Sequence, residues 1–310
     1  MRTAPLYTAM AMAPQGGAAY WLTAPDETRL RLGIWNEGTK GTVFLFPGRT
    51  EYIEKYGPAA REFAAHGYST FSIDWRGQGL ADRLCSDPAL GHIGTFSDYQ
   101  LDVQTMIQTA KRLELPKPWY LMAHSMGGCI GLRALLNGLP VNAAVFSAPM
   151  WGIQISKIVR PFAWAIGWGS RMIGHAESFV PGTSGANYVL SRPFEGNALT
   201  TDRGMFDFMR AHLIQRPELG LGGPSLNWMF EALRECADLA RRPAPAVQTI
   251  VFLGTRERIV DPVAIGERVA HWPGGTLCRI EGAEHEVMME TEAIRRRVFD
   301  VTITHFAAHR

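Results

Sequence analysis

The sequence predicts an α/β protein with a mostly parallel central sheet, helices on both of its faces and an inserted helical cap. Short apolar runs alternate with amphipathic helical segments along most of the 310 residues. This alternation stops near residue 150 and resumes near residue 236. The composition, with 46 % hydrophobic and 19 % charged residues, is that of a globular chain long enough to bury a large core.

The first half of the chain is expected to begin with an antiparallel pair of strands. These strands are AAYWLTA (18–24) and RLRLGIW (29–35), separated by the turn-like sequence PDET. Strands are then expected at 43–46, 69–74, 119–124 and 143–148, and helices at 52–66, 97–113 and 127–137. This order of strand, loop and helix is typical of parallel strands joined by crossover helices.

The last part of the chain resumes the same order after a long interval. We expect strands at 249–254 and 276–281 and helices at 263–270 and 288–308. The interval is rich in aromatic residues, is punctuated by proline and glycine, and has segments that look helical and amphipathic. We therefore predict an α/β core formed by 1–149 and 236–310, with 150–235 as a helical cap or lid.

Charge and cysteine usage exclude several classes of function. The 31 Lys and Arg and 29 Asp and Glu give a net charge of +2 without a basic block, so neither a nucleic-acid face nor a polybasic membrane anchor is indicated. No apolar run approaches the roughly 18 residues of a spanning helix. The N-terminal residues 1–17 are expected to form an arm rather than a signal peptide. Scattered cysteines favour reduced thiols in a cytoplasmic protein. They are Cys85, Cys129, Cys236 and Cys278.

A candidate nucleophile lies in LMAHSMGG (121–128), where Ser125 directly follows one expected strand and precedes an expected helix. Ligands bind beyond the carboxyl ends of strands in open parallel sheets. A serine raised on a strained strand-to-helix turn needs very small residues two positions before and after it, and Ala123 and Gly127 meet this requirement. Ala123 replaces the usual glycine. The alternative is a serine that only caps the helix.

A nucleophilic serine needs a base, and His285 is the best candidate. It follows the expected strand 276–281, so it lies at the same edge of the sheet as Ser125. His124 adjoins Ser125, but neighbouring side chains diverge at a sharp turn, so we expect it to pack beneath the sheet. Other histidines in or beside expected helices are expected to be solvated or hydrogen-bonded. They are His66, His175, His212, His271, His305 and His309.

The acid that orients the base is expected in TRERIVD, after the strand 249–254. Glu257 lies close to the strand end and can reach back over the sheet edge to the imidazole. Asp261 directly precedes Pro262 and fits the N-cap of the following helix equally well. We favour Glu257, and Asp261 stays an alternative.

Two backbone amides are expected to stabilise the oxyanion of the tetrahedral intermediate. One belongs to Met126, the residue after the nucleophile. The other is expected in the loop after the strand 43–46, where Gly48 lets the chain turn and the amide of Arg49 faces Ser125. Each such donor contributes about 3 kcal/mol to transition-state stabilisation.

These motifs together resemble a known family. FPGRTEYIEKYGPAAREFAAHGYSTFSIDWRGQGLADR (46–83), AHSMGG, GTRERIVD and GAEHE match, in order, sequence blocks of the monoacylglycerol lipases and bacterial lysophospholipases of the α/β-hydrolase superfamily. The order of serine, acid and histidine along the chain is also that of α/β-hydrolases. The resemblance implies a serine hydrolase for single-acyl lipids or related esters, with no cofactor and no metal. Pro47 and Arg49-Thr50 depart from the family pattern, as does Glu257 in place of aspartate.

The cap is expected to supply the acyl pocket, and PFAWAIGWG (161–169) can also contact a membrane surface. The alternative is that the aromatic residues form the cap's own core. A small-ester carboxylesterase and an acyltransferase would share the triad, and a non-enzymatic ligand-binding module would share the fold. Ser125 argues against the carboxylate nucleophile of dehalogenases and epoxide hydrolases.

Overall fold

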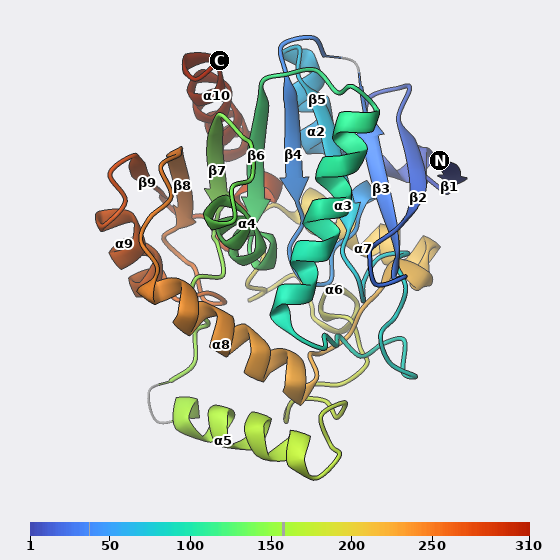
Figure 1. The fold of residues 1–310 in the computed structure, drawn as a ribbon, viewed down its shortest axis with the longest axis vertical. Helices are drawn as coiled ribbons and strands as arrows, with labels where there is room; N and C mark the ends of the chain where they lie inside the picture. Colours follow the sequence, from blue (N-terminus) through green and yellow to red (C-terminus); the bar gives the residue numbers. More distant parts are fainter. Residues whose placement is uncertain (37, 157–158) are drawn as a thin grey trace.

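The computed structural model describes residues 1–36, 38–156 and 159–310. Over these residues the chain forms one sheet with the strand order β1-β2-β3-β5-β4-β6-β7-β8-β9, covered by helices on both faces (Figure 1). The sheet is antiparallel from β1 to β5 and parallel from β5 through β9. The predicted α/β class with a mostly parallel sheet is confirmed.

Every strand that we expected from the sequence is present, to within one residue at either end. The strands are β1 (Arg2–Ala4), β2 (Ala18–Thr23), β3 (Arg29–Trp35), β4 (Thr42–Phe46), β5 (Ser69–Asp74), β6 (Trp119–His124), β7 (Ala143–Ser147), β8 (Gln248–Gly254) and β9 (Gly275–Ile280). Strand β1 was not expected, because it is short and mostly exposed and therefore carries no apolar alternation. The N-terminal segment that we expected to be an arm thus adds an edge strand to the sheet.

The helices of the core cover the sheet in two layers. Helices α3 (Tyr99–Arg112), α4 (Met126–Leu136) and α9 (Pro262–Ala270) share one apolar cluster with the sheet. Helices α2 (Gly57–Ala65) and α10 (Glu292–Ala308) share the other. A further short helix, α1 (Thr8–Ala11), lies in the N-terminal segment.

One predicted helix, 52–66, is divided in the structure. Residues Ile53–Tyr56 form a 3-10 turn, and α2 begins at Gly57 with Pro58 in its first turn. Proline lacks the amide proton that a continuous helix would need at this position, whereas the first turn of a new helix leaves that group without a partner in any case. The predicted helix 288–308 likewise begins later, at Glu292, after a separate turn at Val287–Met289.

The 150–235 segment contributes helices but, in its described part, no strand of the sheet. These helices are α5 (Val159–Met172), α6 (Tyr188–Ser191), α7 (Arg203–Gln215) and α8 (Leu226–Arg241). They lie beyond the carboxyl ends of the parallel strands, with α5 packed on α8 at the far end of the molecule (Figure 1). Helix α8 continues through the boundary predicted at residue 235. No described helix is both long and apolar enough to span a membrane.

The strand order decides which loops meet. Strand β4 pairs in parallel with β6, so the loop after Phe46 lies beside the turn at Ser125. Strands β7, β8 and β9 follow in order, and their carboxyl ends lie at the same edge of the sheet. The residues predicted to carry the chemistry lie at this edge, in loops or, for Met126, at the start of α4.

The first turn of α4 approaches β4 so closely that it tolerates no side chain at Gly127. A Cβ atom there would lie 2.2 Å from the carbonyl oxygen of Phe46 and 2.4 Å from that of Pro47. We therefore expect Gly127→Ala to lower the free energy of unfolding by about 1–3 kcal/mol in a urea titration, because backbone has to move to relieve the overlap. Gly266→Ala is the control, because that position in α9 has open space around it and alanine is the better helix former. Equal stabilities of the two variants would contradict the prediction.

Candidate active site

Ser125 occupies a strained turn between β6 and α4. Its backbone has φ +50° and ψ −117°, a region that non-glycine residues rarely adopt. Hydrogen bonds hold this conformation: the Ser125 amide donates to the carbonyl of Ser147 at 3.0 Å, and its carbonyl accepts from the amide of Met150 at 2.8 Å. The turn presents the partly exposed Ser125 to a pocket.

His285 and Glu257 form a buried hydrogen-bonded pair beside the same pocket. The imidazole Nδ1 lies 2.7 Å from Glu257 Oε2. The other carboxylate oxygen, Oε1, accepts from the amides of Ile259 at 2.6 Å and Val260 at 3.1 Å. The carboxylate is therefore fixed by the backbone and directed at the imidazole. This leaves Nε2 as the nitrogen of His285 that can act as a base.

Asp261, the alternative acid, caps α9 instead. Its Oδ1 accepts from the amides of Val263 at 3.0 Å and Ala264 at 3.3 Å, as an N-cap side chain does. The structure thus brings Glu257, and not Asp261, to His285.

The environment moves the pKa values of the pair in opposite directions. Burial acts to lower the pKa of His285, but the hydrogen bond and charge of Glu257, together with the carboxylates of Glu286 and Glu51, raise it above the ordinary 6.5. Burial acts to raise the pKa of Glu257, but the bond from His285 and the two backbone amides keep it below the ordinary value. The acid therefore stays ionised and supports an imidazolium next to it.

The loop that follows β4 is held rigidly opposite Ser125. Gln78 donates to the carbonyls of Gly48 at 2.8 Å and Glu51 at 3.1 Å, and Trp75 donates to that of Pro47 at 2.9 Å. Among the described residues no acceptor is bonded to the amide of Arg49, nor to that of Met126 at the start of α4. Both groups are available to an oxyanion, as an oxyanion hole requires.

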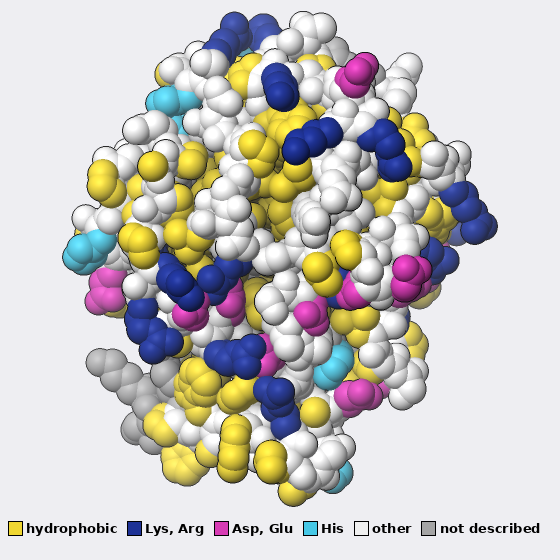
Figure 2. All heavy atoms as spheres, viewed as in Figure 1, with side chains coloured by type: hydrophobic (Ala, Val, Ile, Leu, Met, Phe, Trp, Pro, Cys, Tyr) yellow, Lys and Arg dark blue, Asp and Glu magenta, His cyan; other side chains and the backbone are white. Residues whose placement is uncertain are grey.

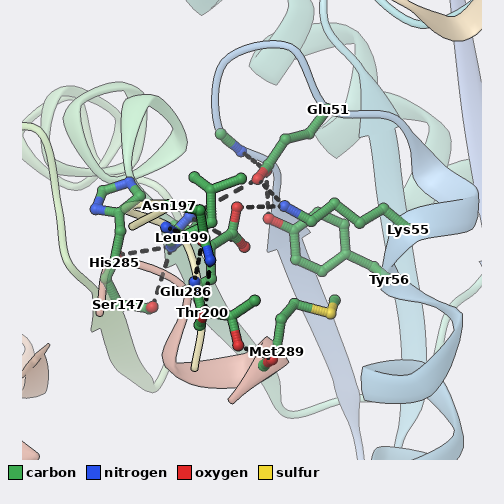
Figure 3. A network of polar contacts seen from close by, with 12 residues as sticks. Glu51, Lys55, Tyr56, Ser147, Asn197, Leu199, Thr200, His285, Glu286 and Met289 are labelled. Carbon is green, nitrogen blue, oxygen red and sulfur yellow. Dashed lines mark hydrogen bonds and ion pairs between the residues drawn. The ribbon is translucent and has the colours of Figure 1, made fainter. Parts of the chain in front are cut away.

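A buried charged cluster lies next to the site, and the sequence analysis missed it. Lys55 Nζ lies 2.5 Å from Glu51 Oε1 and 2.5 Å from Glu286 Oε1, and the hydroxyl of Tyr56 donates to Glu51 at 2.5 Å (Figure 3). The sequence feature that could have predicted this cluster is the number of charged residues directly after the oxyanion loop and directly after His285. One lysine and two carboxylates leave a net negative charge near the imidazole when both acids are ionised, which favours its protonated form.

Three side chains of this region have the spacing of a metal site. One ligand atom each from Glu51, His124 and Glu286 lies within 4.8 Å of the others. The ammonium of Lys55 already lies between the two carboxylates and supplies the positive charge that a cation would bring. The donor set therefore fits an internal ion pair better than a resident metal.

His124 does not pack beneath the sheet as expected. Its ring centroid lies 4.8 Å from that of His285, and the residue lines the pocket. Its Nδ1 lies 3.0 Å from Ser147 Oγ, and burial lowers its pKa to about 3. The ring is thus a neutral neighbour of His285 rather than a second base.

The histidine loop is anchored to the 150–235 segment. The amide of His285 donates to the carbonyl of Ala198 at 3.3 Å, and that of Glu286 donates to Leu199 at 2.8 Å. Thr200 adds a bond from its hydroxyl to the carbonyl of Met289 at 2.7 Å (Figure 3). The position of the imidazole consequently depends on residues of the 150–235 segment.

The pocket that joins these groups is lined by both polar and apolar side chains. The polar lining includes Ser125, His285, Arg49, Glu51, Lys55 and Glu286. The apolar lining comes largely from α6, α7 and the loop between them, and includes Tyr52, Val189, Leu199, Met209, Leu213 and Ile259. The aromatic residues of 161–169 are not part of this lining.

Fold and site define a class: an α/β-hydrolase of the serine hydrolase type. The sequence profile of the family Hydrolase_4, described as serine aminopeptidase, S33, matches residues 37–292, and the chain belongs to this family. The predicted superfamily and enzyme class are confirmed.

Named relatives and solved structures agree with this family. The chain is 30% identical over 282 residues to lysophospholipase L2 of Escherichia coli strain K12. This alignment covers 86% of the chain and 80% of the relative. The chain is 29% identical over 266 residues to the probable lysophospholipase L2 of Haemophilus influenzae, covering 85% and 82%. Its fold is similar to that of a soluble variant of monoglyceride lipase from Saccharomyces cerevisiae, with a TM-score of 0.73, 19% identity and 94% of each chain covered.

The raised pKa of His285 predicts the pH dependence of turnover. Only the neutral imidazole can accept a proton, so activity should fall as the pH decreases through the raised pKa, and the midpoint of the acid limb should lie above pH 6.5. In Glu257→Gln the residual activity should have a lower midpoint, because burial then acts on His285 without its acidic partner. Profiles of kcat/KM against pH test this. A rate that is flat from about pH 8 to pH 5 would contradict a histidine base.

Proposed function

We propose that the protein is a serine carboxylic-ester hydrolase for single-acyl lipids, monoacylglycerols or lysophospholipids, which works through an acyl-enzyme on Ser125. The observation that carries this proposal is the 2.7 Å hydrogen bond from His285 Nδ1 to Glu257, at the edge of a pocket that Ser125 also lines. The names of the lysophospholipase relatives support the choice of substrate class.

The mechanism assigns one role to each group. His285 Nε2 takes the proton of the Ser125 hydroxyl as its oxygen attacks the ester carbonyl, and Glu257 stabilises the resulting imidazolium. The amides of Met126 and Arg49 hold the oxyanion. When the tetrahedral intermediate collapses, the ester C–O bond breaks and the alcohol leaves with the proton from His285. Water, deprotonated by His285, then attacks the acyl-enzyme and releases the fatty acid.

The 150–235 segment is proposed to hold the acyl chain. Val189, Leu199, Met209 and Leu213 all face the pocket from this segment, and their side chains are apolar. Burial of each methylene of a fatty chain against such a wall contributes about 0.8 kcal/mol. We further propose a cytoplasmic location, which is supported by the four cysteines being unpaired.

The proposal is tested by rates on monoacylglycerols, lysophospholipids and short aryl esters, with Ser125→Ala as the blank. We expect single-acyl lipids to be the best substrates, and Ser125→Ala to lose about ten-thousandfold or more in kcat and all labelling by a fluorophosphonate probe. Retained labelling in Ser125→Ala would overturn the role of Ser125. Preference for short aryl esters would favour a small-ester carboxylesterase.

Two further variants and one additive complete this experiment. Glu257→Gln should cost about ten-thousandfold in kcat, whereas Asp261→Asn should stay close to wild type, because asparagine is also a good N-cap. The reverse order would move the acid to Asp261. Added alcohol acceptors should leave the free fatty acid as the main product; efficient transfer to them would identify an acyltransferase.

We also propose that α5 makes transient contact with a lipid surface. Its exposed side chains include Phe162 at 62 %, Trp168 at 61 % and Met172 at 71 %, and Ile173 just beyond it is 72 % exposed. Apolar side chains gather at this end of the molecule (Figure 2). An exposed apolar helix face with tryptophan and phenylalanine is typical of interfacial binding.

Phe162→Glu with Trp168→Glu should weaken binding to phosphatidylcholine vesicles by about tenfold or more, because two apolar groups no longer enter the interface. Vesicle sedimentation measures the effect. Val263→Glu is the control, since Val263 in α9 is also 66 % exposed but lies apart from α5. Equal binding of both proteins would contradict contact through α5.

A further inference from the structure

The guanidinium of Arg49 has no acidic partner among the described residues. Arg49 lines the pocket together with Ser125 and His285. Its Nη2 donates to the carbonyl of Gly222 at 2.7 Å, and its Cζ lies 5.1 Å from the ring centroid of Trp228. Its Nε is buried and has no hydrogen-bond partner among the described residues. This side chain therefore has unused donor capacity.

Two other buried guanidinium groups near the sheet are neutralised. Arg31 is paired with Glu54 and Asp74, and Arg76 with Asp26 and Asp102. The ammonium of Lys55 on the same pocket lies between two carboxylates. Within the described chain Arg49 has no ion pair of this kind. Of the two cations that line the pocket, Lys55 and Arg49, it is the one that no described acid compensates.

Such a cation is costly to bury and strengthens any contact with an anion. Burial lowers the pKa of Arg49 to about 10, so the guanidinium still carries its charge near neutral pH. A charge removed from water regains free energy when an oppositely charged group with matching hydrogen bonds arrives. The planar fork of arginine matches the oxygens of a phosphate or carboxylate.

Neighbouring residues fix the position of the Arg49 guanidinium. Gly91 lies so close that a Cβ atom there would be 2.2 Å from Arg49 Nη2, and only a glycine leaves room for it. The carbonyl of Gly222 and the ring of Trp228 hold the group from two other sides. The side chain is thus positioned by three separate parts of the chain.

The side chain of Arg49 and the headgroup linker of a lysophospholipid span the same number of covalent bonds. In Arg49 these bonds run from the backbone nitrogen, the proposed oxyanion donor, to Cζ. In a 1-acyl lysophospholipid they run from the ester carbonyl carbon to the phosphorus. The two spans are therefore similar in length, which is compatible with a phosphate near the guanidinium when the carbonyl lies at the amide. A monoacylglycerol has only a hydroxyl at that position.

We propose that the Arg49 guanidinium binds the phosphodiester of a lysophospholipid and selects this substrate over the neutral monoacylglycerol. This specificity role rests on the proposed function, because it requires hydrolysis of single-acyl lipids at Ser125. Arg49 acts twice in the complex: its amide faces the oxyanion, and its side chain binds the headgroup.

The test compares two substrates with one acyl chain. kcat/KM is measured for a 1-acyl lysophosphatidylglycerol and for the monoacylglycerol with the same short chain, both below their critical micelle concentrations. In Arg49→Met the ratio of the two values should fall by about tenfold to a hundredfold, the usual effect of losing a charge-assisted hydrogen bond in a desolvated site. Arg49→Lys should retain part of the preference. An unchanged ratio, including an equal loss on both substrates, would overturn the proposal.

Two other variants test whether the change in the ratio comes from the position of the Arg49 guanidinium rather than from the loss of any buried charge. Gly91→Ala should lower the same ratio, because it displaces the far end of a flexible side chain while the charge stays in the protein. Arg83→Met should leave the ratio unchanged; Arg83 is also partly buried and bonded to backbone carbonyls, but it does not line the pocket. A fall in Arg83→Met as large as in Arg49→Met would also overturn the proposal.

Inhibition of the wild-type enzyme tests the proposal without any variant. Glycerophosphoglycerol should inhibit monoacylglycerol hydrolysis competitively, and glycerol at the same concentration should not; equal effects of the two would overturn the proposal. Glycerol 3-phosphate and a short fatty acid separate a phosphodiester site from a general anion site, and stronger inhibition by either would overturn the assignment to a phosphodiester. Failure of the wild type to hydrolyse either lipid would instead refute the proposed function.

Discussion

The close packing of the first turn of α4 against the end of β4 is the constraint on which the site depends. Ser125 sits at φ +50°, and Gly127 lies so near the carbonyls of Phe46 and Pro47 that only hydrogen fits in place of a side chain. This approach brings the amide of Met126 and the loop after β4 to the same place. A looser turn would separate the nucleophile from its proposed oxyanion donors.

The pocket combines two kinds of buried charge. Lys55 is neutralised by Glu51 and Glu286, and this cluster acts on the site through the pKa of the neighbouring His285. Arg49 has no acidic partner among the described residues and is held by a carbonyl and an aromatic ring. A compensated cluster changes the pKa of a neighbouring group. An uncompensated buried charge instead makes the binding of an oppositely charged ligand more favourable. The compensated cluster around Lys55 and the uncompensated Arg49 can therefore serve different purposes in one pocket.

Local patterns in the sequence predicted the strands well because each buried strand is a short apolar run bounded by turns. They predicted β1 and the division at Gly57-Pro58 poorly. A short exposed edge strand has no apolar pattern, and a helix start is easily merged with a preceding turn. His124 shows a different limit. Its sequence position next to Ser125 says nothing about the loops from β4 and β9 that pack around it, and those loops place it beside His285.

The sequence by itself determined the α/β-hydrolase fold and predicted the order of serine, acid and histidine and the small residues that the turn at Ser125 needs, since these depend on local patterns and chain order. Only the tertiary structure distinguished Glu257 from Asp261, because both follow β8 and the difference is which one reaches the imidazole and which one caps α9. The tertiary structure also decided that Lys55 lies between two carboxylates, whereas Arg49 has no acidic partner among the described residues. Charge pairing depends on residues that are far apart in the sequence, such as Lys55 and Glu286, and folding alone brings them together.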